Sequence, residues 1–96
     1  MRLVMVIYAG ETPSAVTGLL DASGSGAWTG FSGAHGSGHT GRREGTRAWP
    51  GEERVFFSLV PDEAVAQLRQ SLSVVRDALP PGERMHAAVM PVDDFF

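Results

Sequence analysis

The stretch from Arg54 to Leu79, RVFFSLVPDEAVAQLRQSLSVVRDAL, decides the fold because a strand pattern changes into a helix pattern inside it. Over residues 54–60, apolar side chains occupy both alternating sets of positions, which predicts a strand with two apolar faces. Pro61-Asp62-Glu63 then opens a helix, since acidic side chains favour the positive end of the helix dipole. The apolar side chains that follow have spacings of three and four, as in an amphipathic helix: Val65, Leu68, Leu72, Val75 and Leu79.

The remaining segments predict a strand-helix-strand unit before this stretch and one strand after it. The continuous apolar run Leu3–Tyr8 is typical of a strand buried on both faces. Thr12 is expected to cap a helix over 13–23, and Gly24 to end it in a left-handed conformation. Shorter patterns predict strands over 26–33 and 85–92.

This order predicts a single ferredoxin-like domain over 1–96, in the α+β class. Four strands form one antiparallel sheet, two helices cover one face, and a long loop joins the second and third strands. Because the helices cover one face, we expect the other to expose an apolar patch, with residues such as Val4, Val6, Phe56 and Val60. Such a patch predicts a homo-oligomer with clefts between its subunits.

Composition excludes several classes of function. The chain has 96 residues, a net charge of −3 and no cysteine. Acidic balance argues against binding of nucleic-acid phosphates, and the absence of thiols removes disulfides, cysteine-based zinc sites and thiol catalysis. All eight basic residues are arginine, which excludes lysine chemistry. No apolar run suits a membrane span, and the run after Arg2 is too short for a signal peptide, so we expect a cytoplasmic protein.

A glycine-rich segment separates the two halves of the chain. Nine of the twelve glycines lie between residues 23 and 51, and we expect a mobile loop over 34–51. Residues 36–41 match G-x-G-x-x-G, but no helix start follows, and Arg42-Arg43 replace the lysine of a phosphate-binding loop. Two interpretations stay open. The glycines form an anion-binding nest beside Arg42, Arg43 and Arg47, or the loop binds nothing alone. Trp49 beside Arg47 either contacts a partner or packs on its own sheet.

The histidines also leave two interpretations. His35, His39 and His86 either share a metal ion, across subunits where needed, or are unliganded side chains of a loop and a strand. Catalytic arrangements are poor, because no acid has a clear place to orient a Ser-His pair. Asp93 and Asp94 are adjacent, so they would point to opposite faces of a strand, and a charged surface tail is the better interpretation. We therefore expect a binding protein and not an enzyme.

The pattern as a whole resembles the PII-like signalling proteins. The resemblance rests on the ferredoxin-like halves, the long glycine-rich loop and Val60-Pro61-Asp62-Glu63 at the start of the second helix. Gly36-Ser37-Gly38-His39 resembles the G-x-G-R stretch at the base of that family's long loop, the T-loop. The resemblance implies a compact homotrimer that binds adenine nucleotides in clefts between subunits. The ligand then biases the T-loop, which meets a partner such as a transporter or an enzyme.

Residues carried over from the family are few. The resemblance implies that the cleft between subunits is lined by Thr29, Gly36, Ser37, Gly38 and His39. The family's second phosphate loop is reduced to residues 80–84, where Gly82 and Arg84 could substitute for its glycines and lysine. The T-loop lacks a tyrosine for uridylylation, because the single tyrosine is Tyr8. Divergent members linked to bicarbonate or metal transport, and the CutA-like metal proteins, therefore fit better than the nitrogen-signalling form.

Overall fold

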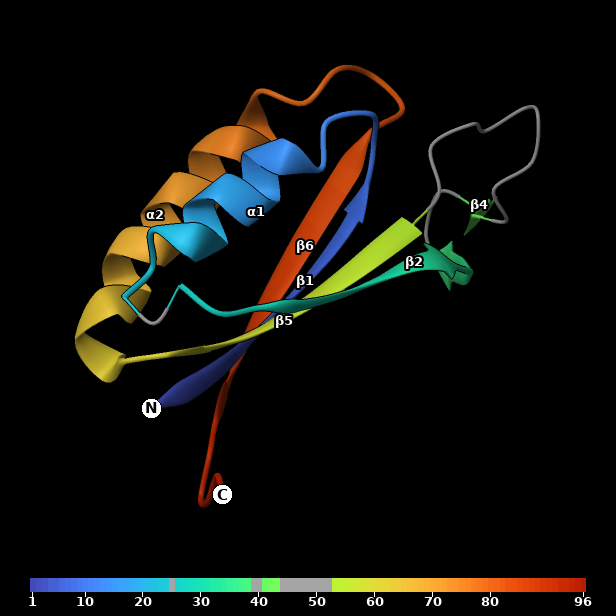
Figure 1. Cartoon of the computed structure of the whole chain (residues 1–96). Helices are drawn as coiled ribbons and strands as arrows, with labels where there is room; N and C mark the ends of the chain where they lie inside the picture. Colours follow the sequence, from blue (N-terminus) through green and yellow to red (C-terminus); the bar gives the residue numbers. More distant parts are fainter. Residues whose placement is uncertain (25, 39–40, 44–52) are drawn as a thin grey trace.

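The computed structural model describes residues 1–24, 26–38, 41–43 and 53–96. These residues form six strands and two helices (Figure 1). Their bounds, in chain order, are β1 (Arg2–Ala9), α1 (Ser14–Asp21), β2 (Thr29–Ala34), β3 (Gly36–Gly38), β4 (Gly41–Arg43), β5 (Glu53–Val60), α2 (Asp62–Asp77) and β6 (Arg84–Pro91).

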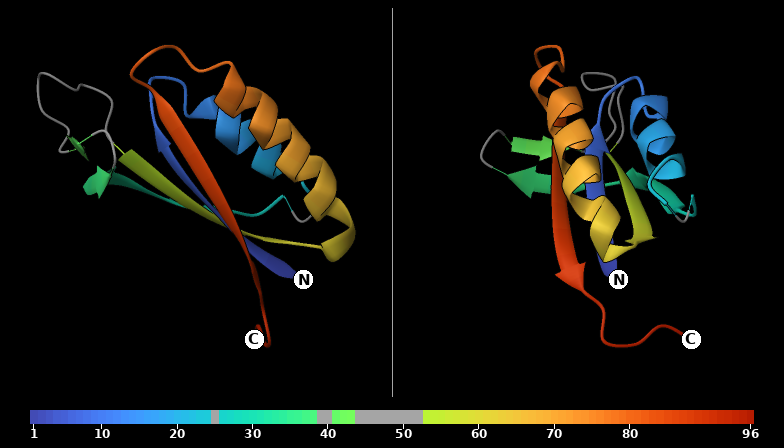
Figure 2. Two further views of the ribbon diagram at one scale, coloured as in Figure 1. Left: turned by 180° about the vertical axis from the view of Figure 1, so that it is seen from behind. Right: turned by 90° about the vertical axis from the view of Figure 1, so that its left-hand side faces the viewer.

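Four of the strands form one sheet in the order β2-β5-β1-β6, and every neighbouring pair is antiparallel. Both helices lie on the same side of this sheet, as the two views of Figure 2 show. The predicted ferredoxin-like α+β architecture is therefore confirmed. The order follows from the two halves, since each βαβ unit leaves a gap that a strand of the other half fills.

The core lies between the helices and one face of the sheet. On the helices, Val16, Leu20, Leu68 and Leu72 are buried. On the strands, the buried residues on the helix side are Val4, Val6, Tyr8, Phe56, Ser58, Val60 and Met85. Ser58 is tolerated there because its hydroxyl donates to the carbonyl of Ala27 at 2.6 Å.

The opposite sheet face, which neither α1 nor α2 covers, is also apolar. We call it the open face. The alternation along the strands and their register assign it Leu3, Met5, Ile7, Phe31, Val55, Phe57, Leu59 and Met90. The prediction of an uncovered apolar face is confirmed, but the residues chosen to represent it were wrong. Val4, Val6, Phe56 and Val60 are at most 4% exposed and pack beneath the helices.

Local details differ from the sequence expectations near α1. The N-cap of α1 is Pro13, and no side chain caps this helix, so the prediction of a Thr12 cap was wrong. The backbone N–H of Thr12 instead donates to the hydroxyl of Tyr8 at 2.8 Å. At the other end of the helix, Gly24 has a φ of 99°, the left-handed conformation that the sequence predicts.

The long segment between β2 and β5 contains two short strands. β2 ends in a bulge, because Phe31 pairs with Val55 whereas Ala34 pairs with Glu53. Gly33, with a φ of 74°, supplies the left-handed residue that such a bulge needs. Beyond it, β3 pairs antiparallel with β4, a pairing that the sequence did not predict within the long loop. Residues 39–40 and 44–52 lie outside the described part of the chain.

Candidate functional site

Apart from Thr29 and the undescribed His39, the predicted ligand residues belong to the two edges of one end of the sheet. One row of paired residues crosses the sheet at this end. It runs from Ala34 on β2 through Glu53 on β5 and Ala9 on β1 to Arg84 on β6. Three steps of about 4.8 Å separate the outer strands, so the end of β2 lies roughly 14 Å from Arg84. Gly36–Gly38 follow β2, and Gly82 precedes β6. A small anion cannot bridge these two groups within one chain; a longer ligand or a second copy is needed.

The turn before β6 has a defined geometry. The N–H of Glu83 donates to the carbonyl of Pro80 at 3.1 Å, and Gly82 has a φ of 88°. These are features of a type II turn, in which proline favours the second position and glycine the third. The predicted remnant of a phosphate loop is thus a four-residue turn, and Arg84, exposed at its end, supplies the positive charge.

Glu83 connects this turn to the first strand. The hydroxyl of Tyr8 donates to a carboxylate oxygen of Glu83 at 3.4 Å and accepts from Thr12. Burial raises the pKa of Tyr8, and the nearby Glu83 charge adds to the increase. Gly10 lies against the same pair, because a β-carbon there would come within 2.5 Å of the Tyr8 hydroxyl. This cluster fixes the turn against the end of β1.

Thr29 lies elsewhere on the sheet. It pairs with Phe57, which places it on the open face, and it is exposed. Ala34 follows five residues later, a distance of roughly 17 Å along a strand. One chain therefore does not bring Thr29 together with Gly36–Gly38. A shared cleft for these residues requires two copies of the chain.

The loop-base and partner residues are described in part. Gly36, Ser37 and Gly38 pair with Arg43, Arg42 and Gly41. An extended ladder differs from the alternating conformations of an anion nest, so nest geometry is absent from 36–38. Three predicted residues, His39, Arg47 and Trp49, lie outside the described part of the chain.

The predicted metal site gains no support. His35 follows β2 and His86 belongs to β6, at opposite edges of the sheet. Both are exposed. Among the described residues, which do not include His39, no three His, Asp or Glu side chains gather as a metal centre would require.

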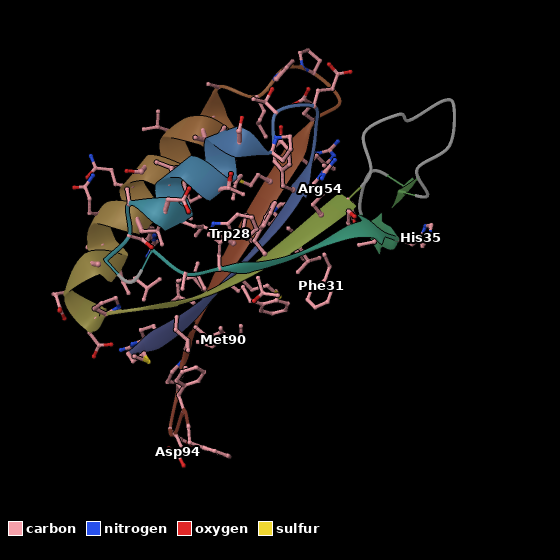
Figure 3. The ribbon with its side chains drawn as sticks, viewed as in Figure 1. Trp28, Phe31, His35, Arg54, Met90 and Asp94 are labelled. Atoms are coloured by element: carbon pink, nitrogen blue, oxygen red, sulfur yellow. The ribbon has the colours of Figure 1, made fainter. Side chains whose placement is uncertain are left out.

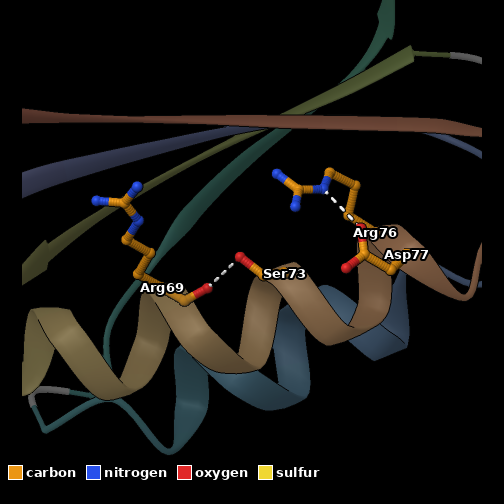
Figure 4. Close-up of polar contacts among 4 residues, drawn as sticks. All are labelled: Arg69, Ser73, Arg76 and Asp77. Carbon is orange, nitrogen blue, oxygen red and sulfur yellow. Dashed lines mark hydrogen bonds and ion pairs between the residues drawn. The ribbon is translucent and has the colours of Figure 1, made fainter.

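Two grooves flank the sheet on its helix side. One, of about 400 Å³, lies between α2 and β6, and its floor includes Val4, Met85 and Val89. Arg69 and Arg76 lie on its rim, two helical turns apart (Figure 4). Arg76 pairs with the adjacent Asp77 at 3.1 Å.

Neither helix in the described residues has the length and apolarity that crossing a bilayer requires.

The other groove, of about 360 Å³, lies between α1 and β2. It is lined by Trp28, Phe56, Arg54 and three hydroxyl-bearing residues, Ser14, Thr17 and Ser32. Figure 3 shows Trp28 between helix and sheet, whereas Phe31 points away on the open face. This groove was not predicted from the sequence. A signal was available, because Arg54 shares its side of β5 with Phe56 and Val60, which places a charge among core positions.

Comparison with known proteins identifies the fold. No protein-family model and no curated protein sequence matches the chain. Among solved structures, it is similar to CPII from Thiomonas intermedia K12, described as a nitrogen regulatory PII-like protein and bound to ADP, AMP and bicarbonate. The identity is 22%, the TM-score is 0.68, and the match covers 93% of this chain and 86% of CPII.

A second similar structure is that of a protein from Thermus thermophilus assigned as PII-like and signalling. Here the identity is 17% and the TM-score 0.63, over 92% of this chain and 82% of the other. The apo form of CPII also matches, with 18% identity and a TM-score of 0.62 over 93% and 89% of the two chains. The resemblance to PII-like proteins predicted from the sequence is thus confirmed as a likeness of fold.

Proposed function

We propose that this chain is a PII-like regulator. It forms a homotrimer in the cytoplasm, binds an adenine nucleotide in clefts between subunits, and controls a partner protein through residues 34–51. It acts as a sensor and not as an enzyme. The observation that carries this proposal is the open face, an apolar sheet surface on a chain with the fold of PII-like proteins.

Assembly follows from the chemistry of the open face. Its side chains include Met5, Phe57 and Phe31, and Phe31 is 57% exposed. Contiguous apolar surface of this kind is uncommon on monomeric proteins and marks an interaction site. Copies of the chain bury it when their open faces pack together around one symmetry axis. Closed rings of identical subunits satisfy this requirement without leaving an exposed edge.

The spacing of the predicted ligand residues supports a cleft between copies. Thr29 on the open face, the loop base at 36–38 and the turn residues Gly82 and Arg84 do not share a groove within one chain. In an assembly through the open face, Thr29 of one copy approaches the neighbouring copy. Structures of CPII bound to ADP and bicarbonate support an adenine nucleotide as the ligand class.

Signalling would proceed by a shift in population. A nucleotide that contacts the loop base favours one arrangement of residues 34–51, and differential affinity for two arrangements is what drives such a change. The partner, a transporter or an enzyme, then meets a surface formed by Arg42, Arg43, Arg47 and Trp49. Arginine and tryptophan are enriched at the centres of protein interfaces.

Thermal unfolding with added ligands tests the nucleotide part of the proposal. Metal-free protein is heated with ADP, AMP, ATP, cyclic AMP, bicarbonate or divalent metal ions. A ligand that binds the folded state at a hundredfold excess over its Kd stabilises it by about 2.7 kcal/mol. We expect ADP, AMP or ATP to raise the Tm. A rise with transition metals alone would contradict the proposal and favour the histidines.

Two matched variants test whether nucleotide binding depends on Arg84. Arg84→Gln should weaken nucleotide binding several-fold, because it removes a charged donor from the predicted cleft. Arg76→Gln removes the same charge from the exposed surface of α2, where the guanidinium pairs with Asp77. Equal affinities in the two variants would remove Arg84 from the site.

A further inference from the structure

The groove between α1 and β2 combines an aromatic wall with a cationic end. Trp28 and Phe56 pack edge to face, with their ring centroids 5.6 Å apart. The indole N–H of Trp28 donates to Asp21 at 2.8 Å, which fixes the orientation of the ring. Trp28 nevertheless stays 40% exposed, so part of the ring is available to a ligand. Such a wall is suited to a flat apolar group.

Arg54 supplies the charge. Arg54 lies opposite Tyr8 in the register of β5 and β1, which places its side chain on the helix side of the sheet (Figure 3). The side chain is half-buried, and its Nε is buried and has no hydrogen-bond partner among the residues that the structure describes. A buried donor without a partner is costly, and structures retain few of them. An acceptor on a bound ligand would satisfy this nitrogen.

The groove has room for such a ligand. Arg54 and Phe56 are two residues apart on the same face of β5, so charge and ring lie close together along the groove. A volume of about 360 Å³ falls within the range of small-molecule sites. Gly30 leaves space in the groove, because a β-carbon there would lie only 3.0 Å from the ring of Phe56 and 3.2 Å from the ring of Trp28.

We propose that the α1–β2 groove binds a small planar organic anion, with its carboxylate on Arg54 and its ring against Trp28. Carboxylates match the two parallel N–H donors of a guanidinium, including Nε. Ser14, Thr17 and Ser32 supply hydroxyl groups for a polar substituent on the ring. This site goes beyond the proposed nucleotide clefts, because it lies on the helix side of the sheet and needs one copy of the chain.

Tryptophan fluorescence tests this proposal with benzoate as the probe. The full-length chain carries Trp49→Phe, which leaves Trp28 as the single indole. We expect benzoate to change the Trp28 emission with a saturable curve. Benzamide, which has the same ring without the charge, should bind at least about tenfold more weakly, since hydrogen bonds to charged groups exceed neutral ones by such a margin. Acetate, which lacks the ring, should also bind more weakly.

Three variants assign the binding to Arg54. Arg54→Gln should weaken benzoate binding about tenfold, whereas Arg54→Lys, which keeps the charge but loses the planar fork, should weaken it less. Arg69→Gln removes an arginine from the rim of the other groove and should leave the affinity unchanged. Circular dichroism and an unchanged ADP response confirm that the Arg54 variants are folded.

Three outcomes would overturn the proposal. The first is the absence of saturable benzoate binding in the millimolar range by the folded protein. The second is equal loss of affinity in Arg54→Gln and Arg69→Gln, and the third is equal affinity for benzoate and benzamide, because either of these would separate binding from the guanidinium. None of them affects the proposed nucleotide site, which is measured with ADP on the same variants.

Discussion

Phe31 of β2 and Phe57 of β5 pack edge to face on the open face, with their ring centroids 6.1 Å apart and their planes at 84°. Phe57 also lies directly opposite Met5 in the register of β1 and β5. These side chains make the middle of the sheet a continuous apolar surface on the side away from the helices. In the proposed trimer, this surface is where copies of the chain meet.

The first prediction concerns assembly. Phe57→Glu should convert the assembly into monomers, because burying an unpaired carboxylate in an apolar interface costs several kcal/mol. Light scattering of the purified variant measures the mass. Val74→Glu is the matched control, since Val74 is 65% exposed on α2 and should tolerate the same charge. Dissociation of both variants, or of neither, would contradict an interface at the open face.

A second prediction uses two glycines of the same half of the chain. Gly18→Ala should stabilise the fold by about 1 kcal/mol, because the residue is in α1 and nothing lies within 4 Å of an added β-carbon. Gly10→Ala should destabilise it, since the added carbon would overlap the Tyr8 hydroxyl and the Glu83 carboxylate. Urea unfolding measures both. A stable Gly10→Ala variant would show that Tyr8 and Glu83 are not held together as described.

The third prediction concerns pH. Burial raises the pKa of Tyr8 above its ordinary value of 10.0. A raised pKa means that the stability contributed by the neutral hydroxyl is present below about pH 10 and is lost as the pH rises through the folded-state pKa. Because the chain has one tyrosine and no lysine, Tyr8 dominates this alkaline range.

Tyr8→Phe provides the comparison. At neutral pH the variant should be less stable by about 1 kcal/mol, because the N–H of Thr12 loses its acceptor. The difference from the wild type should shrink above about pH 10, where the wild type alone must ionise or unfold. Urea unfolding at both pH values measures it. A difference that stays constant or widens at high pH would argue against the buried neutral tyrosine.

Much of the fold could be predicted from the sequence, but the identity of the open face could not. Both alternating sets of residues in β1 and β5 are apolar, so period-two patterns do not say which set the helices cover. Ser58 points to the wrong answer, because a polar residue suggests the exposed side. In the structure its hydroxyl is satisfied by the carbonyl of Ala27, which permits burial among Phe56 and Val60.

The β3–β4 pairing and the α1–β2 groove were not predicted, for different reasons. Gly36–Gly38 carry almost no apolar side chains, so no periodicity indicates that they pair with residues 41–43. The groove depends on tertiary structure, since Trp28 and Arg54 come together only when β2 pairs with β5 beneath α1. The strand order is also needed to see that the predicted ligand residues lie far apart within one chain.

The most direct test of the central claim is a calorimetric titration of ADP into the wild-type protein and into Phe57→Glu, with the mass of each measured in the same buffer. We predict that the wild type is a trimer that binds one ADP per chain. We also predict that the monomeric variant, folded by circular dichroism, loses most of that affinity. A wild type that is monomeric, or a monomeric variant that binds ADP as tightly as the trimer, would contradict a nucleotide site built between subunits.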